Sequence, residues 1–197
     1  MVCETNESIV QVCVCCQVLF AWWGAEELGL FGSTHFVLNL DEGEELPYFA
    51  CDLNFDMIGS PNYARMIYNG SQAEESIRDA SVIIQGLFEE RFKSQGLEYE
   101  LTDFTGRSDY GPFIANGIPA GGLFTGAEVR KTEEQQKVYG GLANAALDPC
   151  YHQACDTYDN VNEVIFEQMA QAAAYTLGVL MGQEDLERYL NSTSLYF

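Results

Sequence analysis

Short apolar segments alternate with helical ones along this chain, and this alternation restricts its fold more than any other feature of the sequence. Strands are expected at residues 17–23, 48–58, 98–104 and 118–124, and helices at 24–39, 72–95, 110–116 and 160–181. Strands that alternate with helices build a mainly parallel sheet whose two faces are covered by the helices. The expected fold is therefore a three-layer α/β sandwich, with its chemistry in loops at the carboxyl ends of the strands.

The helix expected at residues 72–95 has the clearest pattern. Its apolar side chains recur at helical spacing, at Ala73, Ile77, Ala80, Ile84, Leu87, Phe88 and Phe92. Asn160, followed three residues later by Glu163, is a capping-box pattern that predicts a closing helix running to about Met181. The residues from Gln183 onward are polar and are expected to be peripheral. We expect one domain, with an atypical segment at 1–17, the domain itself at 18–182 and a polar tail at 183–197.

The charge of the chain limits its partners. With 30 acidic and 9 basic residues, the formal net charge is −21. Binding to phosphate requires clustered Lys and Arg, so this charge argues against nucleic acid and against an anionic membrane surface. The apolar stretch from Ile9 to Trp23 is fifteen residues long, too short for a membrane span. Its second half, from Gln17, fits a buried strand better.

The cysteines and glycosylation triplets favour a secretory route. There are seven cysteines, and Cys150 and Cys155 bracket a short turn in which a small disulfide loop would fit. Asn-x-Ser/Thr sequons occur at Asn6, Asn69 and Asn191. We therefore expect a secreted protein, or a vacuolar one, although residues 9–23 lack the flanking features of a signal peptide.

Several carboxylates lie in or beside apolar segments, where burying a negative charge is unfavourable. Glu26 and Glu27 directly follow an apolar segment. A bound metal ion would offset the cost of burying these two carboxylates. One of them can bind the dication while its neighbour takes a proton from water. The alternative is an ordinary first helical turn, where acidic residues face the positive end of the dipole. Asp56 lies in an apolar strand and either binds a cation or caps the turn that follows.

His152 is one of two histidines and lies in the loop bracketed by the two cysteines. Such a loop is short enough to hold an imidazole in a fixed geometry. Glu27, Asp56 and His152 form a ligand set suited to zinc, although their spacing is not a compact motif. His35 lies inside a helical segment and is interpreted as structural. The sequence has no nucleotide-binding glycine loop and no Gly-x-Ser-x-Gly nucleophile motif.

Five segments of the chain closely resemble the di-zinc aminopeptidases related to aminopeptidase Y. They are Phe20–Ser33, Leu53–Asn62, Arg107–Phe113, Gly117–Glu128 and Asp148–Thr157, and the resemblance runs from about Val18 to Gly182. This resemblance implies the zinc-peptidase form of the α/β sandwich. It also implies a zinc-dependent metallo-exopeptidase that removes N-terminal residues from peptides.

The resemblance also implies roles for individual residues. Glu26 would be the general base that activates the water between two zinc ions. Glu27 and His152 would bind one zinc, and Asp56 would bind the other. Tyr151 would donate a hydrogen bond to the developing oxyanion.

Further implications concern the loop and the substrate. Cys150 and Cys155 would form the disulfide that fixes the loop, and Arg107 would contact the substrate backbone. The substrate would be a peptide with a free N-terminus, often with a large apolar first residue. The protein would act as a monomer.

The sequence departs from the family at its start. The family takes a His and a bridging Asp from upstream motifs, whereas the first sixteen residues contain neither His nor Asp. Residues 18–182 are therefore expected to be the C-terminal part of a catalytic domain that lacks its first elements. The alternative function is a truncated, catalytically inactive relative or a binding module.

Overall fold

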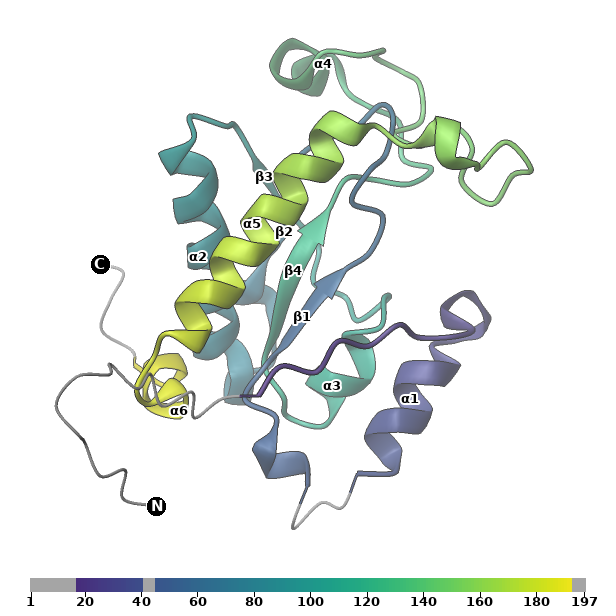
Figure 1. Ribbon diagram of the computed structural model, residues 1–197. Helices are drawn as coiled ribbons and strands as arrows, with labels where there is room; N and C mark the ends of the chain where they lie inside the picture. Colours follow the sequence, from purple (N-terminus) through teal and green to yellow (C-terminus); the bar gives the residue numbers. More distant parts are fainter. Residues whose placement is uncertain (1–16, 41–44, 193–197) are drawn as a thin grey trace, which may run out of the picture.

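The computed structural model describes residues 17–40 and 45–192, so the Asn6 sequon and nearly all of the segment 1–17 lie outside the described residues. A four-stranded sheet forms the centre of the fold (Figure 1). In spatial order its strands are β1 (Asp52–Phe55), β4 (Ala120–Phe124), β2 (Met66–Tyr68) and β3 (Glu100–Thr102). β1 pairs with β4 and β2 with β3 in parallel, whereas β2 and β4 are antiparallel. The expectation of a mainly parallel sheet is confirmed.

Two long helices, α2 (Glu75–Ser94) and α5 (Glu163–Met181), cover one face of this sheet (Figure 1). The apolar positions of α2 are buried as the helical spacing predicts, and Ile84 and Phe88 have no exposed surface. These side chains share the main core with Leu123 of β4 and Met169 of α5. Burial of an apolar side chain of this size contributes about 1.5–3 kcal/mol. The helix predicted over 72–95 is confirmed.

Two shorter helices, α1 (Phe31–Leu38) and α3 (Gly111–Ala115), pack together on the other side of the sheet. Two neighbouring residues of β1 identify the helices on each face of the sheet, because successive side chains of a strand point to opposite faces. Phe55 meets a phenylalanine ring of α2, with 6.2 Å between the centroids. Its neighbour Asn54 instead donates a hydrogen bond to Ser108, just before α3. The three expected layers are therefore present.

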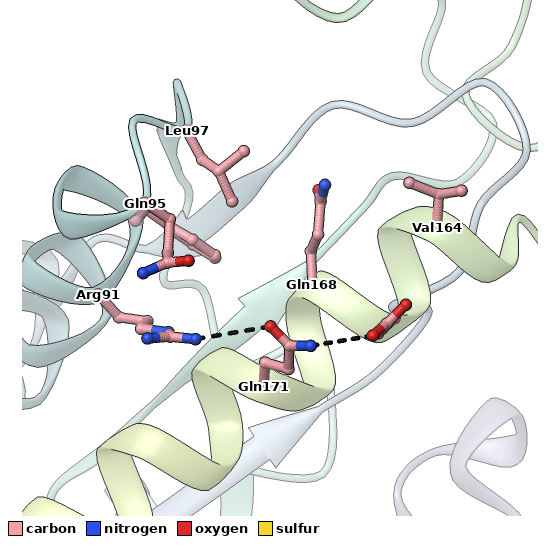
Figure 2. A pocket seen from close by; sticks show the side chains of 8 residues that line it. Arg91, Gln95, Leu97, Val164, Gln168 and Gln171 are labelled. Carbon is pink, nitrogen blue, oxygen red and sulfur yellow. Dashed lines mark hydrogen bonds between the residues drawn. The ribbon is translucent and has the colours of Figure 1, made fainter.

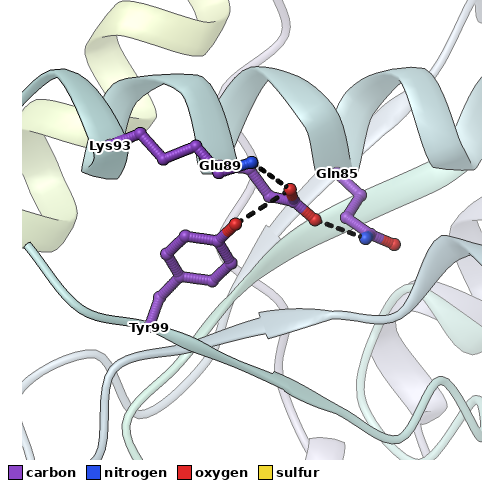
Figure 3. Close-up of polar contacts among 4 residues, drawn as sticks. All are labelled: Gln85, Glu89, Lys93 and Tyr99. Atoms are coloured by element: carbon purple, nitrogen blue, oxygen red, sulfur yellow. Dashed lines mark hydrogen bonds and ion pairs between the residues drawn. The ribbon is translucent and has the colours of Figure 1, made fainter. Parts of the chain in front are cut away.

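A polar cluster on α2 anchors the chain that enters β3 (Figure 3). Glu89 accepts hydrogen bonds from Gln85 at 2.7 Å and from the Tyr99 hydroxyl at 2.9 Å. It also forms an ion pair with Lys93 at 2.9 Å. An exposed pair one helical turn apart contributes only about 0.3–0.5 kcal/mol. The bond from Tyr99, which directly precedes β3, therefore matters more for positioning the strand than the ion pair does.

The buried strand predicted at residues 17–23 is wrong. This segment has no strand pairing within the described residues, and Phe20 and Trp22 are 67% and 88% exposed. Trp23 turns inward and packs against the ring of Phe36 in α1. A continuous apolar run indicates hydrophobicity, but it does not show which strand would supply hydrogen-bond partners. None of the four described strands pairs with these residues.

Two further elements are shorter than predicted. The helix expected over 24–39 is divided, because Leu30 has a left-handed φ of 58° and separates the 3₁₀ turn η1 (Glu26–Leu28) from α1. The strand expected over 48–58 is reduced to β1. A 3₁₀ turn, η2 (Leu46–Tyr48), precedes it and contains Pro47, whose nitrogen has no hydrogen to donate to a sheet. The strands over 98–104 and 118–124 and the helix over 110–116 are present within the predicted ranges.

The sequence did not predict β2 or the helix α4 (Glu133–Tyr139). β2 is a short apolar strand whose three residues are all buried, so its sequence has no alternation of apolar and polar residues. The start of α4 does carry a signal: Thr132 and Gln135 form a complete capping box. At α5 the cap is Asn162, whose side-chain oxygen accepts from the backbone N–H groups of Val164 and Ile165, whereas Asn160 ends the preceding 3₁₀ turn and is not the predicted cap.

The tail differs from the peripheral segment expected. It contains the helix α6 (Leu186–Leu190), and Leu190 is only 3% exposed within the main core. The apolar positions of this short helix were too few to give a helical pattern. Across residues 17–40 and 45–192, no helix has both the length and the apolar character needed to cross a membrane.

Candidate active site

Glu26 and Glu27 begin the short turn η1, directly after the segment 17–23. Ala25 enters this turn with φ of 58°, and Gly29 leaves it with φ of 118°. Left-handed backbone on both sides therefore holds the two carboxylates in a tight loop. A turn of three residues has only a weak dipole, so the dipole explanation for this acidic pair is weak.

Glu27 meets His152 across a large separation in sequence. Glu27 Oε1 lies 2.6 Å from His152 Nε2, and both side chains are about half exposed. The ring of His152 stacks on Tyr151, with 3.8 Å between the centroids. His152 itself has a left-handed φ of 56°. For a residue other than glycine this conformation costs roughly 1–2 kcal/mol. Contacts elsewhere in the loop must therefore stabilise the backbone at His152.

Asp56 directly follows β1, at the carboxyl end of that strand. Ser108 donates a hydrogen bond to Asp56 Oδ2 at 2.7 Å and accepts one from Asn54 at 3.0 Å. Met57, the next residue, has φ of 48°. Ala25, Met57 and His152 thus all have left-handed backbone at or beside the candidate residues, and strain of this kind clusters at functional sites.

Negative charge accumulates around Glu26. Its pKa is raised to about 7, first by partial burial and then by the nearby carboxylates of Asp56 and Glu27. His152 lowers it slightly in return. Burial, followed by the charge of Glu27, also raises the pKa of Tyr151. The Tyr151 hydroxyl therefore keeps its proton and can act as a hydrogen-bond donor.

Residues 11–177 match the model of a family described as peptidase family M28. The chain belongs to peptidase family M28. This confirms, at the level of the family, the resemblance found in the sequence motifs. The matched region contains all of the candidate residues Glu26, Glu27, Asp56 and His152.

Curated relatives of this M28 chain include two aminopeptidases. Leucine aminopeptidase 2 of Trichophyton rubrum is 49% identical over 162 residues, which cover 81% of this chain and 32% of that protein. An aminopeptidase of Pseudomonas aeruginosa is 48% identical over 161 residues, which cover 81% of this chain and 30% of that protein. The chain thus spans about a third of the length of the curated relatives that it matches.

Solved structures with the same fold include two bacterial aminopeptidases. BSAP, a zinc aminopeptidase from Bacillus subtilis, has a TM-score of 0.55 at 24% identity, covering 79% of this chain and 34% of its own. The LapA aminopeptidase of Legionella pneumophila has a TM-score of 0.58 at 17% identity, covering 83% of this chain and 39% of its own. At these identities the likeness shows the fold, and it confirms the expected α/β zinc-peptidase architecture.

The donor chemistry of this M28 site fits zinc, which binds carboxylate oxygen and imidazole nitrogen. Glu27 and His152 already touch, and a dication would relieve the repulsion among the carboxylates around Glu26. The described residues nevertheless contain no group of three His, Cys, Asp or Glu side chains arranged to hold a metal ion. The structure therefore brings together Glu27 and His152, whereas Asp56 does not complete a cluster with them.

Two residues of the candidate site have no role in the prediction from the sequence. Ser108 orients Asp56, and Asp109 accepts a hydrogen bond of 2.5 Å from the buried hydroxyl of Ser33 in α1. Both belong to the segment Arg107–Phe113, one of the five that carry the resemblance, although the spacing of this segment does not indicate these contacts. Arg107 itself is exposed.

The sulfur atoms of Cys150 and Cys155 lie 2.06 Å apart, five residues apart in sequence. Replacing both cysteines by Ser is expected to lower the free energy of unfolding by about 2 kcal/mol, because the bond restricts the unfolded chain and the shortness of the loop keeps this effect small. Urea unfolding of the oxidised protein measures the change. As a matched control, a reducing agent should destabilise the wild type by a similar amount and leave the double variant unchanged. Equal stability of the oxidised wild type and the variant would contradict the bond.

Proposed function

We propose that this chain takes part in the zinc-dependent removal of N-terminal residues from peptides. The contact between Glu27 and His152, beside the acidic side chain of Glu26, is the observation that carries the proposal. The two relatives named as aminopeptidases support the same reaction. In this proposal Glu27 and His152 hold one zinc ion, and Asp56 contributes to a second.

Each residue has a distinct part in the proposed reaction. Zinc, when bound, supplies a Lewis acid that lowers the pKa of water and polarises a carbonyl group. Glu26 takes a proton from the attacking water and returns it to the leaving amine. Tyr151 donates a hydrogen bond to the oxygen on which negative charge develops. Arg107 contacts the backbone of a peptide whose N-terminus is free.

We also propose that the chain follows a secretory route. The pairing of Cys150 with Cys155 supports this, since disulfides persist in oxidising compartments. The Asn69 sequon supports it as a glycan acceptor, and its Ser71 hydroxyl donates a hydrogen bond of 2.6 Å to Asn69 Oδ1.

A second candidate function is a non-catalytic M28 relative or binding module. It is favoured by one observation, namely that the described residues contain no three-ligand group for a metal. Such a protein would bind no zinc stoichiometrically and would release no amino acid from a peptide substrate.

The proposed function is tested by measuring metal content and hydrolysis together. The purified chain is expected to release p-nitroaniline from leucine p-nitroanilide, to lose this activity with EDTA and to regain it with zinc. N-acetyl-leucine p-nitroanilide, which has no free amine, should not be cleaved. His152→Gln should weaken zinc binding at least about tenfold. Activity that resists chelation would contradict the zinc mechanism, and a chain with neither zinc nor activity would support the second candidate.

A further inference from the structure

A cavity of about 270 Å³, open to solvent on one side, lies between the end of α2 and the first turns of α5 (Figure 2). Arg91 of α2 and Gln95, the residue that follows this helix, line the cavity on one side, and Glu167 and Gln171, one turn apart on α5, line it on the other. Leu97, which follows α2, and Val164 add apolar surface. The cavity therefore combines both signs of charge, uncharged amides and an apolar wall.

The two charged side chains of the cavity are held apart by an amide. Gln171 Oε1 accepts from Arg91 at 3.5 Å, and Gln171 Nε2 donates to Glu167 at 3.0 Å (Figure 2). Within the described residues, neither Arg91 nor Glu167 takes part in an ion pair. A guanidinium and a carboxylate separated by one amide, and facing the same cavity, offer complementary partners to a small molecule that itself carries both charges.

A second guanidinium lies behind the wall of the cavity. Arg65 is only 4% exposed and donates to Gln168, a lining residue, at 2.5 Å. Its Nε is buried with no hydrogen-bond partner among the described residues, and its guanidinium lies 5.7 Å from the ring of Phe92, another lining residue. Buried cations are normally paired with an anion. Arg65 therefore favours negative charge on the Gln168 side of the cavity.

We propose that this cavity binds a free α-amino acid with an aliphatic side chain. The α-carboxylate faces Arg91 and Gln168, the α-ammonium faces Glu167, and the side chain lies against Leu97 and Val164. The volume of about 270 Å³ lies just below the roughly 300–1,000 Å³ of small-molecule pockets, so the ligand must be small. A bare anion would meet Glu167 and a bare cation would meet Arg91, so a zwitterion fits better than either. This site is independent of the proposed aminopeptidase function.

Binding of L-leucine to the full chain, stripped of metal with EDTA, tests the proposal by isothermal titration calorimetry. One equivalent is expected to bind. Leucinamide, which lacks the carboxylate, and 4-methylpentanoate, which lacks the ammonium, should each bind at least about tenfold more weakly. Shifts of the side-chain amide resonances of Gln95, Gln168 and Gln171 in NMR spectra would locate the ligand.

Variants distinguish this cavity from the candidate active site. Arg91→Gln and Glu167→Gln should each weaken leucine binding at least about tenfold. The matched changes Arg188→Gln and Glu187→Gln on α6, and His152→Gln in the candidate active site, should leave it unchanged. Absence of binding at about 10 mM leucine, or binding lost in His152→Gln and retained in Arg91→Gln, would overturn the proposal. Neither outcome contradicts peptide hydrolysis at the candidate active site, so the two proposals fail separately.

Discussion

Glu26→Gln is expected to lower the turnover of leucine p-nitroanilide by about a thousandfold while zinc content stays unchanged. General base catalysis contributes roughly 10²–10⁴-fold, and glutamine keeps the shape of the side chain but cannot accept a proton. Glu26 is surrounded by carboxylates and already has a pKa raised to about 7, which suits a group that takes and returns a proton near neutral pH. The measurement is kcat and KM together with metal content by elemental analysis.

Two control variants separate a base from a ligand. Glu27→Gln should lose zinc and activity together, because the Glu27 carboxylate contacts His152. Glu75→Gln, at an exposed position in the first turn of α2, should change neither. If Glu26→Gln retains turnover close to that of the wild type, Glu26 is not the base. If it loses zinc as Glu27→Gln does, it acts as a ligand.

The pH dependence gives an independent readout of the same role. A base must be ionised to act, so kcat/KM should rise with pH through the pKa of Glu26 and then level off. A bound dication favours the carboxylate and lowers its pKa, so this rise should lie below pH 7 in the zinc-loaded protein. The rise should be absent from the residual activity of Glu26→Gln. An unchanged acidic limb in that variant would assign the titration to another group.

Periodicity predicted the covering helices well because their burial is one-sided. Ile84 and Phe88 of α2 recur at helical spacing and face one core, so the pattern in sequence and the burial in space agree. The segment 17–23 failed for the opposite reason. Its apolar run has no polar alternation to specify a face, and whether such a run becomes a strand depends on a hydrogen-bond partner elsewhere in the fold.

The candidate site could be predicted only as a set of residue types. Adjacent carboxylates and one histidine suggested metal chemistry, and the resemblance paired Glu27 with His152, which the structure brings to 2.6 Å. Nothing in the local pattern showed that Ser108 would orient Asp56, because 52 residues separate them and only the packing of the α3 segment across β1 joins them. Such long-range hydrogen bonds follow from the topology and cannot be read from spacing.

Asp52→Asn is expected to stabilise the metal-free protein by about 2–4 kcal/mol at pH 8 and to have little effect at pH 4. Asp52 opens β1, and its Oδ2 atom is buried with no hydrogen-bond partner among the described residues. Burial, aided by the charge of Asp109, raises its pKa from 3.8 to about 7. A shift of this size corresponds to about 4 kcal/mol, which is an upper limit because the native state can relax around the charge.

The direction of the pH effect follows from proton binding. Between about pH 4 and pH 7 the native state holds a proton on Asp52 that the unfolded chain has lost, so the stability of the wild type falls as pH rises through this window. Asparagine cannot ionise, so the difference between variant and wild type should grow from pH 4 to pH 7 and then stay constant. Urea unfolding at pH 4, 6 and 8 in EDTA measures it, with Asp79→Asn on the exposed side of α2 as the matched control. A difference in stability that does not change with pH would mean that Asp52 has the same pKa in the native state as in the unfolded chain. Burial would then not raise this pKa.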